Sequence, residues 1–152
     1  RGKVPFTVLP SQEAKNISDY DHVVIDTEAR PSNQDLQTLA RFSDLILFPA
    51  TPDLLSLDVL ITTIKDFKRL KLDTSYAVLL NIIPPPPSQA GERVRQALRN
   101  ENIPTLKNGI RRYVAYQKAV FSGQIVNKVN DPRASVAWSD CLKVAKELEQ
   151  MV

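Results

Sequence analysis

Cysteine and glycine are scarce in this chain, and each shortage excludes a class of site. Cys141 is the single cysteine among 152 residues, so no disulfide can form within the chain. Zinc and iron–sulfur sites built from paired cysteines are excluded for the same reason. We therefore expect the protein to work in a reducing compartment.

The four glycines, Gly2, Gly91, Gly109 and Gly123, lie too far apart to form a phosphate-binding loop. Neither GxxxxGKS nor GxxxxGKT occurs, and no lysine is followed directly by serine or threonine. A loop of that kind would cradle the phosphates of a bound nucleotide with its backbone N–H groups and its lysine. The sequence supplies no such cradle.

Long apolar runs are also absent. No run approaches the roughly 20 residues that a membrane-spanning helix needs. Only a few apolar residues separate Arg1-Gly2-Lys3 from Pro10, which is too little for a signal peptide. The chain begins without Met inside a strand-like stretch, and we expect that its natural start has been removed. These features predict a cytoplasmic protein with no membrane partner.

The composition is that of a globular protein, with 43% hydrophobic and 24% charged residues. Its length suits a single domain, residues 1–152, with a sizeable core. The net charge of +3 is mildly basic and compatible with an anionic partner.

Short apolar runs alternate with amphipathic stretches along the chain. The runs predict strands at 5–9, 22–26, 45–48, 76–83 and 104–106. Helices are predicted at 34–42, 56–70, 88–100, within 111–121 and at 131–150, while 11–17 fits either a short helix or a loop. This alternation is typical of βαβ units, so we expect an α/β fold with a mostly parallel sheet flanked by helices.

The run from His22 to Asp26 carries the first chemical signal. Three β-branched apolar residues lead into the carboxylate of Asp26, which predicts a strand buried on both faces. Ligands of open α/β sheets bind beyond the carboxyl ends of such strands, where Asp26 would hold a metal-bound phosphate. Alternatively, Asp26 is only a turn former, bonding its own backbone.

Four stretches follow one another in a characteristic order: Asp19–Thr27, Asp44–Asp58, Tyr76–Asn81 and Ile110–Gly123. Their order and spacing resemble the ParA family of bacterial DNA-partition ATPases, within the ParA/MinD group of deviant P-loop ATPases. The resemblance extends from about residue 5 to about residue 150. It implies a P-loop NTPase-like fold that is incomplete at its N-terminal side, because the family's phosphate-binding loop lies upstream of every stretch seen here.

The resemblance also implies roles for individual residues. Asp26 would bind Mg²⁺ through water, and Thr27 would lie next to the γ-phosphate. Four residues, Asn81, Ile82, Ile83 and Pro84, would border the adenine of ATP; alternatively, they form only a polar strand end and a rigid loop. Asp53 would lie near the nucleotide site and the interface of a homodimer. Glu28 and Arg30 add charges where the family has a switch segment.

Basic and aromatic residues are interleaved between positions 107 and 118. The cations are Lys107, Arg111, Arg112 and Lys118, with Tyr113 and Tyr116 between them. Lys and Arg that neutralise phosphates would suffice for the family's binding of DNA without sequence preference. A solvated surface with no ligand is the other interpretation of the same residues.

Two functions follow from these observations. The first is a ParA-type ATPase domain that dimerises with ATP and Mg²⁺ and binds DNA on the nucleoid. Such a domain moves plasmid or chromosomal DNA and is regulated by a centromere-binding partition protein. Without the phosphate-binding lysine, we expect the 152-residue chain alone to show little or no ATPase activity. The second is a non-catalytic module for nucleic-acid or protein binding that has kept the fold and lost the nucleotide site.

Overall fold

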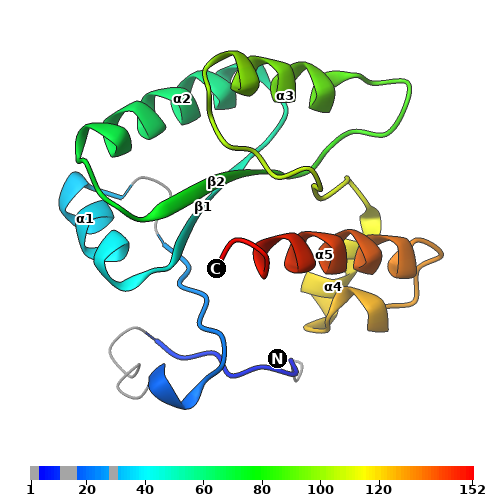
Figure 1. Cartoon of the computed structure of the whole chain (residues 1–152). Helices are drawn as coiled ribbons and strands as arrows, with labels where there is room; N and C mark the ends of the chain where they lie inside the picture. Colours follow the sequence, from blue (N-terminus) through cyan, green and yellow to red (C-terminus); the bar gives the residue numbers. More distant parts are fainter. Residues whose placement is uncertain (1–3, 11–16, 28–30) are drawn as a thin grey trace.

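The computed structural model describes residues 4–10, 17–27 and 31–152, and within them helices and strands alternate (Figure 1). The helices are α1 (Asn33–Phe42), α2 (Leu54–Arg69), α3 (Ala90–Asn100), α4 (Val114–Ser122) and α5 (Ala134–Leu148). The strands are β1 (Leu45–Ala50) and β2 (Ser75–Leu80), and two short 3-10 turns are η2 (Ile17–Asp19) and η3 (Val126–Lys128). The predicted α/β class is confirmed.

β1 and β2 form a parallel pair, with Leu45 opposite Ser75 and Ala50 opposite Leu80. The segment 104–111 continues the sheet beyond β2 through two isolated parallel bridges, Val78 to Thr105 and Ile83 to Arg111. We call residues 104–111 the outer segment. Its first bridge falls at the predicted strand 104–106. Figure 1 shows α2 and α3 on one face of this sheet and α5 on the other.

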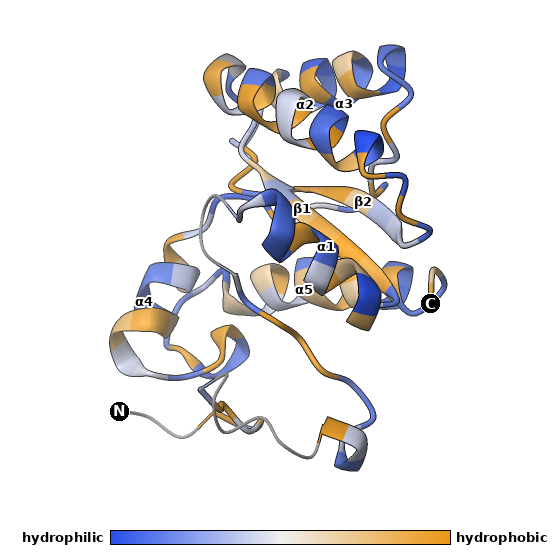
Figure 2. Cartoon of the chain, turned by 90° about the vertical axis from the view of Figure 1, so that its left-hand side faces the viewer, coloured by the Kyte–Doolittle hydropathy of each residue, from blue (hydrophilic) through white to orange (hydrophobic). Residues whose placement is uncertain are grey.

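The two faces of the sheet belong to separate cores, as the alternation of side chains along a strand requires. Phe48, Val78 and Leu80 pack with α2 and α3 in the larger core, where Phe67 meets the rings of Phe48 and Tyr76 edge-on. The other face packs against α5. Its buried members are Ala77, Leu106 and Val144. Figure 2 shows the hydrophobic strands lying between the two helical layers.

The predicted helices are confirmed with small changes of boundary. Ser32 caps α1 through a capping box with Asp35, and Asp53 caps α2 by accepting a hydrogen bond from the Ser56 amide at 2.8 Å. Gly123 ends α4 in the left-handed conformation. Gln89, rather than Ser88, precedes α3, and Asp131 bonds the Arg133 amide one turn before α5 begins.

Two predicted strands are wrong. Residues 5–9 and 22–26, which both fall within the described ranges, form no strand, and Val24 is 93% exposed. A strand needs a hydrogen-bonded neighbour, and neither segment is paired with β1, β2 or the outer segment. An apolar run alone therefore does not decide the structure here. His22, expected inside the strand at 22–26, is exposed. The segment 11–16 lies outside the described residues.

Two strand limits also differ from prediction. Pro49 lies inside β1 rather than ending it, while β2 ends at Leu80 rather than at Ile83. The Ala50 carbonyl faces β2, where it accepts from Asn81, so the alternation of a strand turns Pro49 toward the other edge. Proline is tolerated on an edge because no ladder hydrogen bond needs its missing N–H.

Gly109 provides a test of packing between the outer segment and β2. A Cβ atom at Gly109 would lie 2.7 Å from Ile83 Cδ1 and 2.8 Å from the Leu80 carbonyl oxygen. We expect Gly109→Ala to lower the free energy of unfolding in urea by about 1–3 kcal/mol, because the backbone oxygen cannot move aside cheaply. Gly91→Ala is the matched control: its Cβ would meet Ile83 Cγ2 at 3.0 Å, a side-chain atom. Equal losses from both would contradict this explanation.

Candidate functional site

The loop after β2 holds the residues predicted to border adenine. The Asn81 amide donates to the Ala50 carbonyl at 2.8 Å, and its side-chain oxygen accepts from the Ile82 amide at 2.8 Å. Ile82 has a positive φ of 53°, which is rare for a β-branched residue and costs about 1–3 kcal/mol. The conformation of Ile82 is therefore imposed by the surrounding structure and not by the backbone preference of isoleucine.

The outer segment supports the rest of this loop. The Ile83 amide donates to the Ile110 carbonyl at 3.0 Å, and the Ile83 carbonyl accepts from the Arg112 amide at 2.8 Å. Gly91 and Gly109 leave room for the Ile83 side chain. Pro84 is half-buried at the start of the proline run. The loop Asn81–Pro84 is thus fixed at the carboxyl end of β2, whatever it binds.

Asp53 lies at the carboxyl end of β1, but its carboxylate already has partners. It accepts from the Thr51 hydroxyl at 2.5 Å and from the Ser56 amide at 2.8 Å. These hydrogen bonds lower the pKa of Asp53 to about 2, with that from Thr51 contributing most. Asp53 is therefore ionised at neutral pH and acts first as the cap of α2.

Asp26 and Thr27 lie far from this loop in the sequence and belong to no helix or strand. Both are exposed, on the segment that was predicted to be a buried strand. Among the described residues, no group of three or more His, Cys, Asp or Glu is placed to hold a metal ion. A Mg²⁺ ion beside a nucleotide needs only one or two carboxylates, so the role predicted for Asp26 stays a prediction. Glu28 and Arg30 lie outside the described residues.

Arg111 is the most constrained of the predicted DNA-binding cations. Its Nε donates to Asp140 Oδ2 at 2.9 Å and its Nη2 donates to Asp140 Oδ1 at 2.6 Å, a bidentate pair. The guanidinium also lies over the Tyr113 ring, 5.4 Å from its centroid. The hydrogen bonds to Asp140 raise the pKa of Arg111, so this side chain stays charged. Arg111 is held in place rather than free to follow a ligand.

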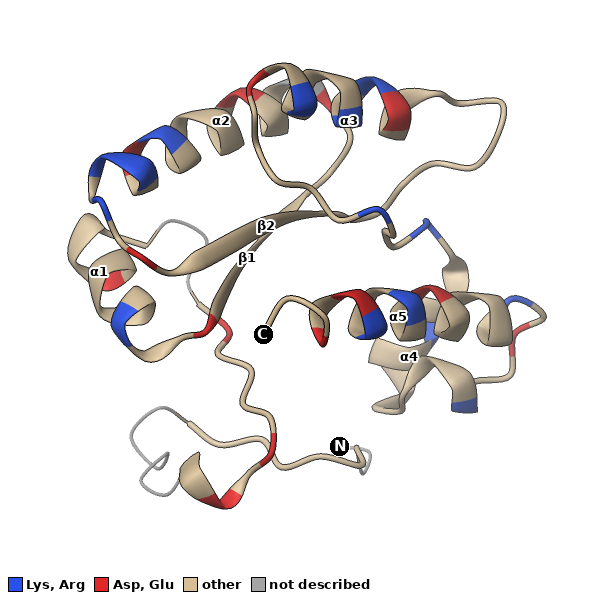
Figure 3. Ribbon diagram, viewed as in Figure 1, with Lys and Arg blue, Asp and Glu red and all other residues tan. Residues whose placement is uncertain are grey.

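The other predicted cations divide into one paired and two unpaired side chains. Lys118 Nζ lies 2.8 Å from Asp131 and also donates to the Asn130 carbonyl. Lys107 and Arg112 are exposed and take part in no ion pair with another described residue. Tyr116 is committed to packing, because its hydroxyl donates to the Ala137 carbonyl at 2.8 Å; burial raises its pKa. Figure 3 shows how these charges are distributed over the ribbon.

Two carboxylates of α5 were missed from the sequence. Asp140 is 5% exposed, and Glu147 accepts from the Lys107 amide at 2.6 Å, the Asn108 amide at 2.9 Å and the Asn108 side chain at 2.8 Å. They are seven residues apart and so share a helix face. That spacing was the available signal, but the alanine- and valine-rich stripe on the same helix is the stronger pattern.

Burial and hydrogen bonding act in opposite directions on Glu147. Burial alone would raise its pKa, but the amides of Asn108 and Lys107 and the Asn108 side chain together hold it below the ordinary value of 4.5. The ionised carboxylate is therefore the form that stabilises the outer segment at neutral pH.

No protein-family model matches the chain. The chain is similar to a protein of Gloeobacter kilaueensis named "Maintenance of carboxysome distribution protein A", with 28% identity over 139 residues. The match covers 91% of this chain and 64% of the relative, so the chain spans just under two thirds of the relative's length. No helix in the parts of the chain that the structure describes is both long and apolar enough to cross a bilayer.

Removal of the buried carboxylate of Asp140 tests the pair with Arg111. We expect Asp140→Asn to lower the free energy of unfolding by about 1–3 kcal/mol, because a charged hydrogen bond is lost while half-exposed Arg111 can still reach water. Urea unfolding followed by circular dichroism measures the loss. Glu149→Gln, an exposed carboxylate of the same chain end, serves as the control and should be near neutral.

The pKa of Glu147 predicts how its contribution depends on pH. The folded-state pKa lies below 4.5, so the stabilisation is complete above that value and is lost as the pH falls through the lower folded-state pKa. The stability difference between the wild type and Glu147→Gln should therefore be constant from pH 8 to about pH 6 and shrink below about pH 4.5. A difference that is unchanged at pH 3 would contradict this role.

Proposed function

We propose that this chain is part of a ParA-type ATPase that positions a cargo in a bacterial cell. The observation that carries the proposal is the ordered series of four stretches, from Asp19–Thr27 to Ile110–Gly123, in one α/β chain. The similarity over 91% of the chain to a protein named for the maintenance of carboxysome distribution supports a positioning role. Plasmid, chromosome and protein compartment are all cargoes of the right kind.

In this proposal the loop Asn81–Pro84 contributes the adenine side of an ATP site, and Asp26 holds Mg²⁺ through water with Thr27 beside it. Asp53 lies near the interface of an ATP-dependent homodimer. Lys107 and Arg112 contact DNA phosphates, while ion-paired Arg111 and Lys118 position the surface around them. A partition-type partner protein regulates the cycle. The phosphate-binding loop is not among these 152 residues.

A second candidate is a binding module that does not use ATP. Two observations favour it: the glycine-rich loop is absent from the sequence, and Asp26 lies on an exposed segment rather than at the end of a sheet strand. The outer segment is held by hydrogen bonds to α5, so its cations are in place without a nucleotide. Such a module would bind DNA equally with and without ATP.

ATP binding separates the two candidates. We compare by calorimetry the 152-residue chain with a chimera that adds, upstream of Val4, the P-loop strand and helix of a ParA-family ATPase. The first candidate predicts that only the chimera binds Mg²⁺–ATP and that Asp26→Ala weakens this at least tenfold. Asp19→Ala, an exposed carboxylate of the same segment, is the control.

DNA binding completes the comparison. Fluorescence anisotropy with a 30-base-pair duplex should show ATP-dependent binding by the chimera if the first candidate is right. If the chimera fails to bind ATP and both proteins bind DNA equally with and without it, the second candidate replaces the first. Appreciable ATP hydrolysis by the 152-residue chain, abolished by Asp26→Ala, would contradict the proposed need for an added loop.

A further inference from the structure

A groove of about 390 Å³ lies between α3, the outer segment and α5. We call it the α3–α5 groove. Its charged lining consists of Arg95 from α3, Lys107 and Arg111 from the outer segment, Lys143 and Asp140 from α5, and Glu92 from α3. The volume falls within the range of about 300–1,000 Å³ that is usual for small-ligand sites. The groove is distinct from the loop Asn81–Pro84, although Ile83 forms part of its wall.

Both lining carboxylates are already neutralised by partners. Asp140 holds Arg111 in the bidentate pair, and Glu92 lies 2.7 Å from Arg99 on the solvent side of α3. Glu147, at the margin, is committed to three N–H donors. Within the described residues, Arg95, Lys107 and Lys143 take part in no ion pair. Three cations from three different elements are thus left facing one groove.

Arg95 is the fixed member of these three. It is half-buried, and its Nη1 donates to the Leu106 carbonyl, which anchors the guanidinium against the outer segment. Its Nη2 would lie 3.3 Å from a Cβ atom at Gly109, so the missing side chain of Gly109 leaves room for the guanidinium. Burial lowers the pKa of Arg95, and the nearby carboxylates of Glu92 and Glu147 offset this only in part. An anion in the groove would relieve that cost.

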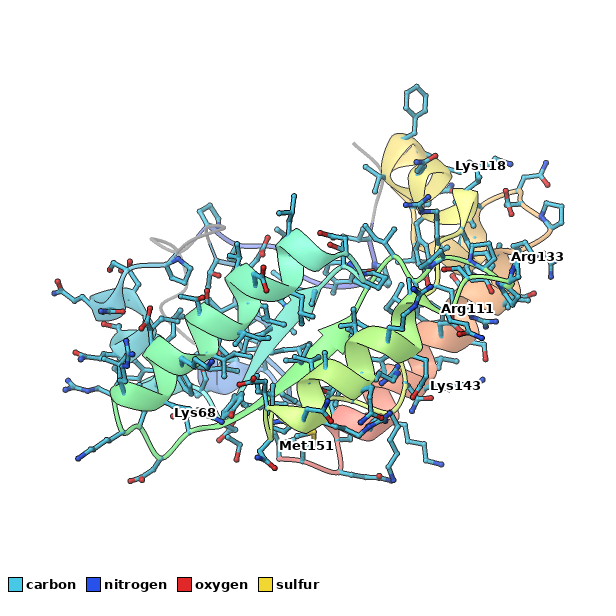
Figure 4. The ribbon with its side chains drawn as sticks, turned by 90° about the horizontal axis from the view of Figure 1, so that it is seen from above. Lys68, Arg111, Lys118, Arg133, Lys143 and Met151 are labelled. Atoms are coloured by element: carbon cyan, nitrogen blue, oxygen red, sulfur yellow. The ribbon has the colours of Figure 1, made fainter. Side chains whose placement is uncertain are left out.

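We propose that the α3–α5 groove binds a phosphate group. A phosphate has several acceptor oxygens and suits the remaining donors of the Arg95 guanidinium plus two exposed ammonium groups better than a single carboxylate does. The phosphate belongs either to a small anion or to the backbone of a nucleic acid, which present the same oxygens. Figure 4 shows Arg111 and Lys143 on the same flank of the molecule, while Lys118 projects from α4 and Lys68 lies toward the far end.

The inference does not depend on ATP hydrolysis, so it is tested without ATP. Pyrophosphate is titrated into the wild-type chain by calorimetry at low salt. The Lys143→Gln and Lys107→Gln variants should each weaken binding about tenfold, as expected for the loss of one charged hydrogen bond. Lys107→Gln keeps the backbone amide that Glu147 binds, so it does not disturb the outer segment. Arg95→Lys keeps the charge but loses the planar guanidinium. Its affinity for pyrophosphate should lie between those of the wild type and the two Lys→Gln variants.

Lys146→Gln is the matched control for Lys143→Gln. Lys146 is exposed on the same helix, three residues away, and does not line the groove. Equal losses from Lys143→Gln and Lys146→Gln would mean that only overall charge matters, and would overturn the site. Failure of both pyrophosphate and duplex DNA to bind would also overturn it.

The DNA arm identifies the source of the phosphate. If the groove takes nucleic-acid backbone, duplex DNA binds, Lys143→Gln lowers the slope of log K against log salt by about 1, and pyrophosphate competes. If it takes a small anion, pyrophosphate binding is sensitive to Lys143→Gln and DNA binding is not. Either result supports a phosphate site, and neither depends on the outcome of the ATP experiment.

Discussion

The hydrogen bonds from α5 to the outer segment are the constraint on which the rest of this structure depends. Residues 104–111 are bridged to Val78 in β2 and to Ile83 just after it, and no strand of the described chain pairs with the segment's other edge. Unpaired amide groups at a sheet edge cost free energy when they are buried. When they are exposed, they can pair with a strand of another chain. Glu147 accepts the amides of Lys107 and Asn108, and Asp140 accepts the amide and guanidinium of Arg111. Two side chains thus take the place of a strand.

This arrangement links the core between the sheet and α5 to the loop after β2. The Ile110 carbonyl of the outer segment and the Arg112 amide just after it hold Ile83, and α5 supports the segment from its other edge. The unusual φ of Ile82 then follows, because the residues on both sides of it are fixed by other parts of the fold. A helix at the C-terminal end of the sequence therefore controls the geometry of a loop some sixty residues earlier, near Asn81.

The sequence predicted what is local and missed what depends on pairing. Amphipathic spacing located α2, since this signal repeats within one or two turns of the helix itself. The strand predicted at His22–Asp26 has an equally clear apolar run, yet a strand is defined by its neighbour, which a run of residues does not encode. The charge of Asp140 was visible, but its burial against Arg111 was not, because the pair spans 29 positions.

The same reasoning applies to the predicted DNA-binding residues. Counting Lys and Arg between 107 and 118 treated each as a free charge, but two of those four cations are neutralised by Asp140 and Asp131. Arg95 and Lys143 lie outside that stretch and join Lys107 only because α3 and α5 pack on opposite faces of one sheet. An anion-binding surface is set by the cations left without carboxylate partners, so its location follows from tertiary pairing rather than from the density of basic residues. Among the described residues that line the α3–α5 groove, Arg95, Lys107 and Lys143 are such cations.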